Sequence, residues 1–196
     1  MKIESGTGNG KWARVSERNR LFVNSKSAPI QHIAAIEDQS TFQVIGTATC
    51  ANGTVTPLTI KNTGTETEIV LTYIRWQILD PTGGSPIPNA SNYLQIGYDA
   101  EFSSGGSVAT PVNMTAGSSQ TSNATCYGTN PTLTGSLTVF DRHYPKAEGD
   151  MYSFNKEGAA ILKPGQSISF QYVGDHTAGT VYVRCSFYTE PLGGDR

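Results

Sequence analysis

The sequence has little charge. Only 15% of its 196 residues are Asp, Glu, Lys or Arg, whereas roughly 25% is usual for a soluble domain. The 14 basic and 16 acidic side chains leave a formal net charge of −2. A protein that binds nucleic acid through its phosphates needs an excess of clustered Lys and Arg. We therefore expect no nucleic-acid partner.

Long apolar runs are also missing. No stretch approaches the roughly 20 apolar residues that a membrane helix needs. Residues 1–20 are polar and rich in glycine, and they lack the apolar segment of a secretory signal. We expect a protein that has no membrane partner and is not secreted.

Cysteine is scarce. Cys50, Cys126 and Cys185 lie far apart, without a C-x-x-C pair or a histidine at the spacing of a zinc site. A free cysteine packs as a small hydrophobic residue. The pattern predicts three buried thiols without a disulfide framework or a zinc site. Because Asp and Glu are scattered as well, we expect no metal and no other cofactor.

The sequence contains no familiar catalytic motif. The patterns G-x-S-x-G, H-E-x-x-H and G-x-x-x-x-G-K-[ST] do not occur in it. The glycines of residues 6–10 follow no expected strand and precede no expected helix, so we interpret them as flexible chain and not as a phosphate-binding loop.

The three histidines, His32, His143 and His176, are widely spaced. Asp141, Arg142 and His143 come nearest to a polar cluster, but adjacent residues of a strand point to opposite faces, so they are not expected to form one site. We expect histidines with structural or surface roles, and a protein that is not an enzyme.

Alternation of apolar and polar residues is what the sequence does contain. Within residues 179–190, Val181 and Val183 alternate with Tyr182 and Arg184, as a half-buried strand requires. Residues 166–174 alternate in the same way, and the short polar loop at 175–179 predicts that the two strands form a hairpin. Further strands are predicted at residues 41–45, 55–61, 93–98, 136–140 and 159–162.

A third long run covers residues 68–79. The side chains on one face of this predicted strand are all apolar, and those on the other face are mixed and begin with the apolar Leu71. Apolar residues on both faces are typical of a central or covered strand, and they also predict a surface between copies of the chain. The apolar set is Val70, Ile74, Trp76 and Ile78, and the mixed set is Leu71, Tyr73, Arg75 and Gln77. We expect Trp76, and Phe170 in the run 166–174, to point inward. We expect a homotrimer.

Many short strands with Gly- and Pro-rich connections predict the fold class. The chain holds 21 glycines and 10 prolines, and no helical stripe extends beyond a turn or two near residues 31–38. The pattern predicts an all-β protein, an antiparallel β-sandwich of jelly-roll or Ig-like type, over residues 38–196.

Two regions depart from this pattern. Residues 103–131 are a long polar stretch, which predicts a projection or a flexible insertion. Residues 1–37 lack sustained alternation and predict an extended N-terminal arm that orders when it binds a partner. The arm residues expected to make this contact are Lys11, Trp12, Arg14, Arg18, Arg20, Leu21 and Phe22.

Carbohydrate binding is an alternative function. Sugar sites on β-sandwiches use exposed aromatic rings as platforms, flanked by polar side chains. Tyr182 and Tyr188 fall on the polar face of their predicted strand, and other tyrosines lie near predicted loops: Tyr93, Tyr98, Tyr127 and Tyr152.

One segment is similar to a known group of proteins. Residues 10–23 read G-K-W-A-R-V-S-E-R-N-R-L-F-V, which resembles the opening G-x-x-A-x-V-x-x-x-N-R-L-x-V of small virion proteins of tailed bacteriophages. In those proteins, as here, a polar arm precedes a β-domain. The order of three later segments also resembles theirs: 41–46, 57–62 and 162–167.

The resemblance implies a structural component of a phage particle: a capsid decoration (cement) protein, or a neck or tail component. Its partners would be the major capsid protein or other virion proteins, and it would be assembled into the virion in the host bacterial cytoplasm. Such proteins commonly act as homotrimers. The alternative that stays open is a receptor- or carbohydrate-binding virion module.

Overall fold

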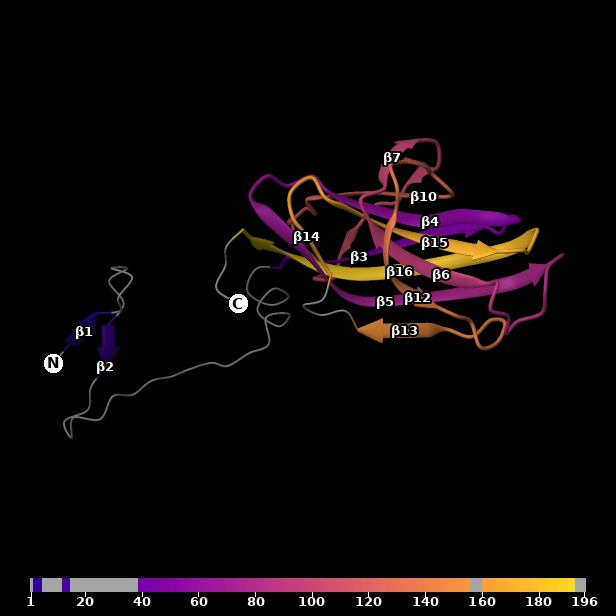
Figure 1. Ribbon diagram of the computed structural model, residues 1–196. Coiled ribbons are helices and arrows are strands. Elements are labelled where there is room, and N and C mark those ends of the chain that lie inside the picture. Colours follow the sequence, from indigo (N-terminus) through magenta and orange to yellow (C-terminus); the bar gives the residue numbers. More distant parts are fainter. Residues whose placement is uncertain (1, 5–11, 15–38, 156–159, 193–196) are drawn as a thin grey trace. The chain divides into compact units, whose positions relative to one another are not determined.

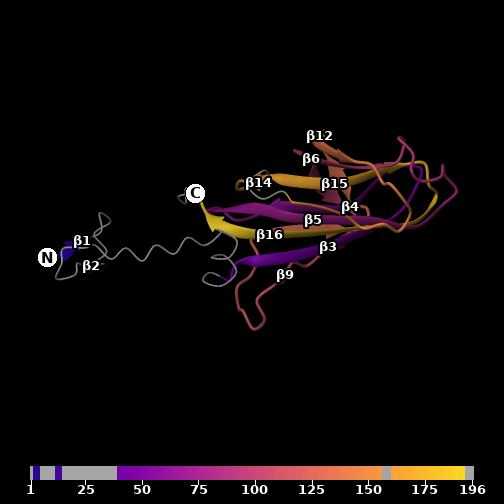
Figure 2. The ribbon, with the colours of Figure 1, turned by 90° about the horizontal axis from the view of Figure 1, so that it is seen from below.

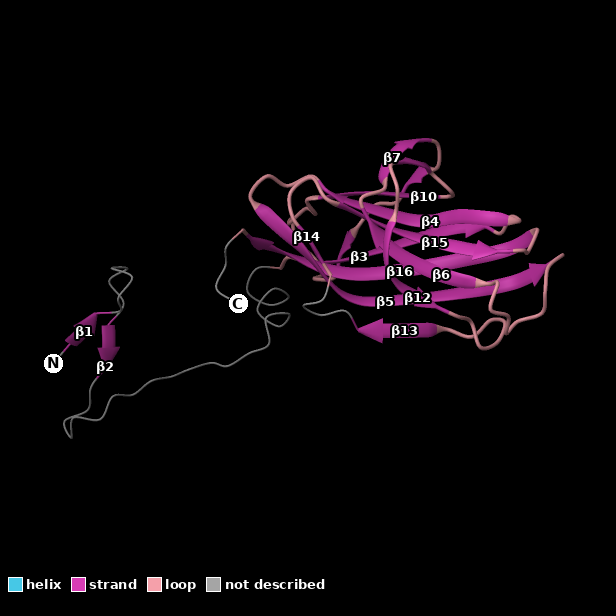
Figure 3. Ribbon diagram, viewed as in Figure 1, coloured by secondary structure: helices cyan, strands magenta, loops and turns pink. Residues whose placement is uncertain are grey.

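The computed structural model describes residues 2–4, 12–14, 39–155 and 160–192. Every regular element in these residues is a strand (Figures 1 and 3). The described residues contain no helix that could cross a membrane. The all-β prediction is therefore confirmed. The chain divides into two compact units, Met1–Ile30 and Gln31–Arg196.

The first unit contains a short antiparallel pair. Strand β1 (Lys2–Glu4) pairs with β2 (Trp12–Arg14), with Glu4 opposite Trp12.

The second unit contains two antiparallel sheets that pack face to face. One, here called the β4 sheet, has the order β12-β6-β15-β4-β10-β8. Its strands are β4 (Gly53–Asn62), β6 (Tyr93–Tyr98), β8 (Ser107–Val108), β10 (Ala124–Gly128), β12 (Thr138–His143) and β15 (Ser167–Gly174).

The other, the β5 sheet, has the order β13-β5-β16-β3-β9, and β14 also pairs with β5. Figure 2 shows the strands β12, β6 and β15 of the first sheet above β16, β3 and β9 of the second. The strands of the β5 sheet are β3 (Thr41–Thr49), β5 (Thr67–Thr82), β9 (Val112–Asn113), β13 (Tyr152–Asn155), β14 (Ile161–Leu162) and β16 (Ala178–Pro191). A separate pair joins β7 (Glu101–Ser104) to β11 (Thr132–Thr134).

One apolar core fills the space between the two sheets. Trp76, Phe170 and Tyr172 are among its largest fully buried side chains. Gly46 lets the sheets approach closely, because a Cβ there would collide with the carbonyl oxygen of Pro57 on β4. The sequence prediction that Trp76 and Phe170 point inward is confirmed.

The three cysteines are buried and unpaired, as predicted. Burial raises the pKa of the Cys50 thiol to about 11 and that of Cys126 to about 12. Burial also holds the pKa of Cys185 well above its ordinary value. These thiols therefore stay protonated at neutral pH and act as core side chains.

The predicted hairpin between residues 166–174 and 179–190 is wrong. Strand β15 pairs with β4 and β6, whereas β16 pairs with β3 and β5 in the opposite sheet. The short loop therefore crosses from one sheet to the other. Both strands alternate because each presents one face to the shared core, and this pattern is the same whether or not two strands pair with each other.

The predicted faces of β5 need a correction at its start. Ile69 and Leu71 belong to the main core together with Ile74, while Val70 belongs to a small separate cluster. The cause is an irregularity in the ladder with β16, where Thr72 is an extra residue on β5. An extra residue shifts all earlier side chains to the other face.

Residues 103–131 are also more ordered than predicted. They supply β8 and β10 to one sheet and β9 to the other. Cys126, at the centre of β10, lies in the main core opposite Ile60 of β4. The polar composition concealed these strands because few of their side chains are buried: both residues of β8 are exposed, and β9 contributes no fully buried side chain.

Candidate functional site

The outer faces of the two sheets differ in what covers them. On the β4 sheet, Ser169 is fully buried, and the hydroxyl of Ser167 donates a hydrogen bond to the carbonyl oxygen of Ala100, just before β7, at 2.9 Å. On the β5 sheet, by contrast, Ile45 is 48% exposed and Tyr182 is 37% exposed. The second sheet therefore presents an open face.

Two arginines lie side by side on this open face. Arg75 of β5 is directly opposite Arg184 of β16, and Arg184 is in turn opposite Ile45 of β3. Two residues further along the strands, Tyr182 lies opposite Gln77. Strand alternation explains the arrangement, because the neighbours Trp76 and Val183 are buried.

Arg75 is held in place by a neighbouring tyrosine. Its Nε donates to the hydroxyl of Tyr73 at 2.8 Å, and its guanidinium carbon lies 4.8 Å from the centre of the Tyr73 ring. Hydrogen bonding by Ser153 and then by Arg75 holds the pKa of Tyr73 below its ordinary value. The Arg75 side chain is thus oriented before any ligand arrives.

The residues of this face form a groove of about 280 Å³. We call it the arginine groove. Its apolar and polar walls come from β3, β5, β16 and the residue before β13: Ile45, Arg75, Trp76, Gln77, Met151, Tyr182, Val183 and Arg184. Among the residues that the structure describes, no carboxylate forms an ion pair with Arg75 or Arg184. Like charges directly opposite each other on a sheet repel, so the groove favours an anion.

The other predicted aromatic platforms pack against side chains of the same unit. Tyr188 is only 4% exposed and packs with Val70, so its predicted exposure is wrong. The remaining tyrosines contact other rings of the same unit: Tyr93 with Tyr144, Tyr98 with Phe140, Tyr127 with Phe102, and Tyr152 with Trp76. Only Tyr182, among the tyrosines named from the sequence, lies in the arginine groove.

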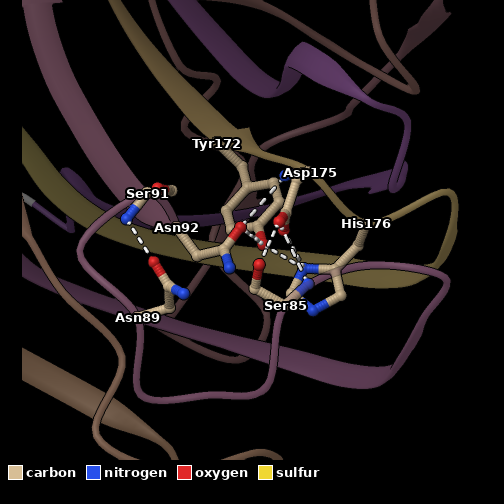
Figure 4. Close-up of polar contacts among 7 residues, drawn as sticks. All are labelled: Ser85, Asn89, Ser91, Asn92, Tyr172, Asp175 and His176. Atoms are coloured by element: carbon tan, nitrogen blue, oxygen red, sulfur yellow. Dashed lines mark hydrogen bonds and ion pairs between the residues drawn. The ribbon is translucent and has the colours of Figure 1, made fainter.

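A partly buried polar cluster occupies one end of the sandwich (Figure 4). It joins the connection between β5 and β6 to the loop between β15 and β16. Ser85 donates to Asp175 Oδ2 twice, from its hydroxyl at 2.5 Å and from its backbone N–H at 3.0 Å. These hydrogen bonds, led by the Ser85 hydroxyl, lower the pKa of Asp175.

The aromatic half of this cluster lies deeper. The Tyr172 hydroxyl donates to Asn92 Oδ1 at 3.1 Å and lies 2.8 Å from His176 Nδ1. Burial raises the pKa of Tyr172 well above its ordinary value. His176 is 2% exposed, so of the structural and surface roles that the sequence left open for this loop residue, it has the structural one.

The cluster contains Ser, His and Asp but does not form a nucleophile–base pair. The Ser85 hydroxyl bonds to the carboxylate of Asp175, whereas His176 bonds to Tyr172 and lies 3.9 Å from Asp175 Oδ1. Nucleophilic catalysis needs the hydroxyl within reach of the imidazole. These hydrogen bonds instead hold the connection between β5 and β6 against the loop between β15 and β16.

Asp141 and His143 do come together, contrary to the sequence interpretation. They are two residues apart on β12, so they share a face, and His143 Nε2 lies 3.0 Å from Asp141 Oδ2. The His143 ring stacks on Phe154 at 3.9 Å. Arg142 points elsewhere, over the ring of Tyr93. In the part of the chain that the structure describes, no three His, Cys, Asp or Glu side chains gather as a metal site.

Two of the seven predicted arm residues are among the residues that the structure describes. Trp12 and Arg14 are the first and last residues of β2. The others lie outside the described residues: Lys11, Arg18, Arg20, Leu21 and Phe22. His32 and the predicted helical turn at 31–38 lie outside them as well.

No family model matches the sequence, and no curated protein matches it. A chain in the structure of the Gx strain of infectious bursal disease virus is similar at 12% identity, over 78% of this chain and 38% of that chain, with a TM-score of 0.15. This chain therefore spans well under half of that viral chain, and a likeness this weak carries no argument about function.

Proposed function

We propose that this protein is a non-enzymatic structural component of a tailed-phage particle, and that it acts as a capsid decoration protein. Its N-terminal unit attaches it to the major capsid protein or another virion protein. The observation that carries this proposal is the division of the chain into a sandwich and a separate N-terminal unit with its own strand pair. The N-terminal sequence motif supports the assignment to phage.

The chemistry of the N-terminal unit suits an acidic, partly apolar shell surface. Its basic residues include Arg14, Arg18 and Arg20, and its apolar residues include Trp12 and Phe22. A segment that orders on binding spreads its contacts over a wide area, at modest affinity for each unit of area. The sandwich supplies the rigid body that remains on the particle surface.

Deletion of residues 1–37 tests this proposal. The truncated protein should fold, with unchanged far-ultraviolet circular dichroism of the sandwich, but should occupy purified particles poorly. A matched control replaces three basic residues of the sandwich, Lys61, Arg142 and Lys163, with Ser in the full chain, and should retain binding. Full occupancy by the truncated protein would contradict the proposal.

A second function, a receptor- or carbohydrate-binding virion module, is favoured by a different observation. The open face of the β5 sheet carries a groove with an exposed tyrosine and two arginines without acidic partners among the described residues. This function concerns the sandwich alone and is compatible with attachment through the N-terminal unit.

A further inference from the structure

The arginine groove combines three kinds of side chain that one small ligand could contact together. Arg75 and Arg184 supply positive charge, Gln77 supplies an amide, and Tyr182 supplies an exposed ring. These four residues form a quadrilateral, because Arg75 is opposite Arg184 and Gln77 is opposite Tyr182. Neighbouring strands lie roughly 5 Å apart, and residues i and i+2 lie roughly 7 Å apart along a strand.

The two arginines determine the charge of the ligand. Arg184 is exposed, and neither guanidinium has an ion-pair partner among the described residues. Arg75 is already oriented by Tyr73, so little side-chain freedom is lost when it binds an anion. A guanidinium group binds a carboxylate with two parallel hydrogen bonds. The groove is therefore matched to a planar anionic group.

The pairing of the strands beneath the two arginines bears on whether the groove binds a peptide or a compact ligand. A peptide commonly binds a sheet by adding a strand to a free edge. Here β5 pairs with β13, β14 and β16, and β16 pairs with β5 and β3. Strands β5 and β16 have no free edge beneath the groove, so a ligand that lies between Arg75 and Arg184 is recognised there by side chains.

The uncharged walls favour a sugar ring. The aromatic face of Tyr182 can pack on the C–H face of a pyranose, and the Gln77 amide can both donate to and accept from hydroxyl groups. The groove volume of about 280 Å³ lies near the lower end of small-molecule sites, which suits one ring and its substituents. Ile45 and Met151 border this space.

We propose that the arginine groove binds an acidic saccharide, with the carboxylate of one uronic-acid-type unit between Arg75 and Arg184 and its ring on Tyr182. The inference builds on the second function proposed above. It does not depend on the N-terminal unit or on a role in the virion.

The test uses the full-length protein and two matched probes, trigalacturonic acid and its fully methyl-esterified form. Isothermal titration calorimetry at low ionic strength should show saturable binding of the acid. The ester keeps the rings and removes the charge, so it should bind at least about tenfold more weakly, as expected when charged hydrogen bonds are lost. Equal binding of both probes, or no binding of the acid at millimolar concentration, would overturn the proposal.

Three variants locate the site. Arg184→Gln and Tyr182→Ala should each weaken binding of the acid by about tenfold or more, whereas Tyr182→Phe should retain most of it because the ring remains. The matched control is Arg142→Gln, which removes a guanidinium that also lies over a tyrosine ring, but on β12 of the other sheet. An equal loss in Arg142→Gln would show non-specific attraction and overturn the assignment.

A third probe separates the sugar from an acidic peptide. A hexapeptide that contains three glutamates should bind much more weakly than trigalacturonic acid. If it binds as well, and Arg184→Gln removes that binding, the groove is a peptide site and the saccharide proposal is wrong. Because none of these measurements involves particles, their failure is distinguishable from a failure of the attachment proposal.

Discussion

The hydroxyl of Thr72 donates a hydrogen bond to the backbone carbonyl oxygen of Ser186 at 3.0 Å, at the place where β5 has one residue more than β16. This bulge decides which side chains of β5 enter the core. Before it, Ile69 and Leu71 face inward; after it, Ile74 does. The same shift leaves Val70 on the outer face, where it packs against Tyr188.

Core packing gives the first prediction. Trp76 and Phe170 are buried between the sheets, so replacing either with Ala should lower the free energy of unfolding by about 3–5 kcal/mol. Urea unfolding monitored by circular dichroism measures this change. Met114→Ala is the control, since Met114 is 56% exposed, and it should stay within about 0.5 kcal/mol of the parent. A similar small effect for Trp76→Ala would contradict the packing described here.

The contact between Tyr172 and His176 gives the second prediction, which concerns the variant His176→Ala. In His176→Ala the buried Tyr172 hydroxyl loses one of its two hydrogen-bond partners. We therefore expect the free energy of unfolding to fall by about 1–3 kcal/mol. The double variant with Tyr172→Phe should lose less than the sum of the two single variants, because neighbouring residues couple. Additive losses would show that the two side chains do not stabilise each other.

The third prediction concerns pH. Hydrogen bonds from Ser85 lower the pKa of folded Asp175 below the ordinary aspartate value of 3.8. A lowered folded-state pKa adds stability that is present above the unfolded value and is lost as the pH falls through the folded value. The difference in unfolding free energy between the parent and Asp175→Asn should therefore be largest near neutral pH and shrink below about pH 4. The exposed Asp150 provides the control, Asp150→Asn, and an identical pH profile for both variants would contradict this account.

The fourth prediction is the homotrimer. The apolar start of β5 no longer supports it, because Val70 and Tyr188 are covered within the chain, and the prediction now depends on the prevalence of symmetric homo-oligomers and on the resemblance to phage proteins. Light scattering of the full chain at micromolar concentration should give three times the 21.0 kDa mass of one copy. A single-copy mass, with no larger species on the particle, would contradict the prediction.

Local pattern alone determined much of the fold. Period-two alternation predicted β5, β15 and β16 and the inward positions of Trp76 and Phe170, because a strand buried on one face must alternate. Richness in β-branched, aromatic and other apolar residues predicted β3, β4, β6, β12 and β14. The spacing of the three cysteines likewise predicted unpaired buried thiols.

Only the tertiary structure decided which strands pair and which side chains each outer face of the sandwich exposes. Alternation is the same in β15 and β16 whether they form a hairpin or lie in different sheets, and a one-residue bulge at Thr72 is invisible in the composition of β5. Arg75 and Arg184 are more than a hundred positions apart in the sequence, and only the register of β5 with β16 places them together. The sequence determined what each strand could bury; the pairing of distant strands determined what the molecule exposes.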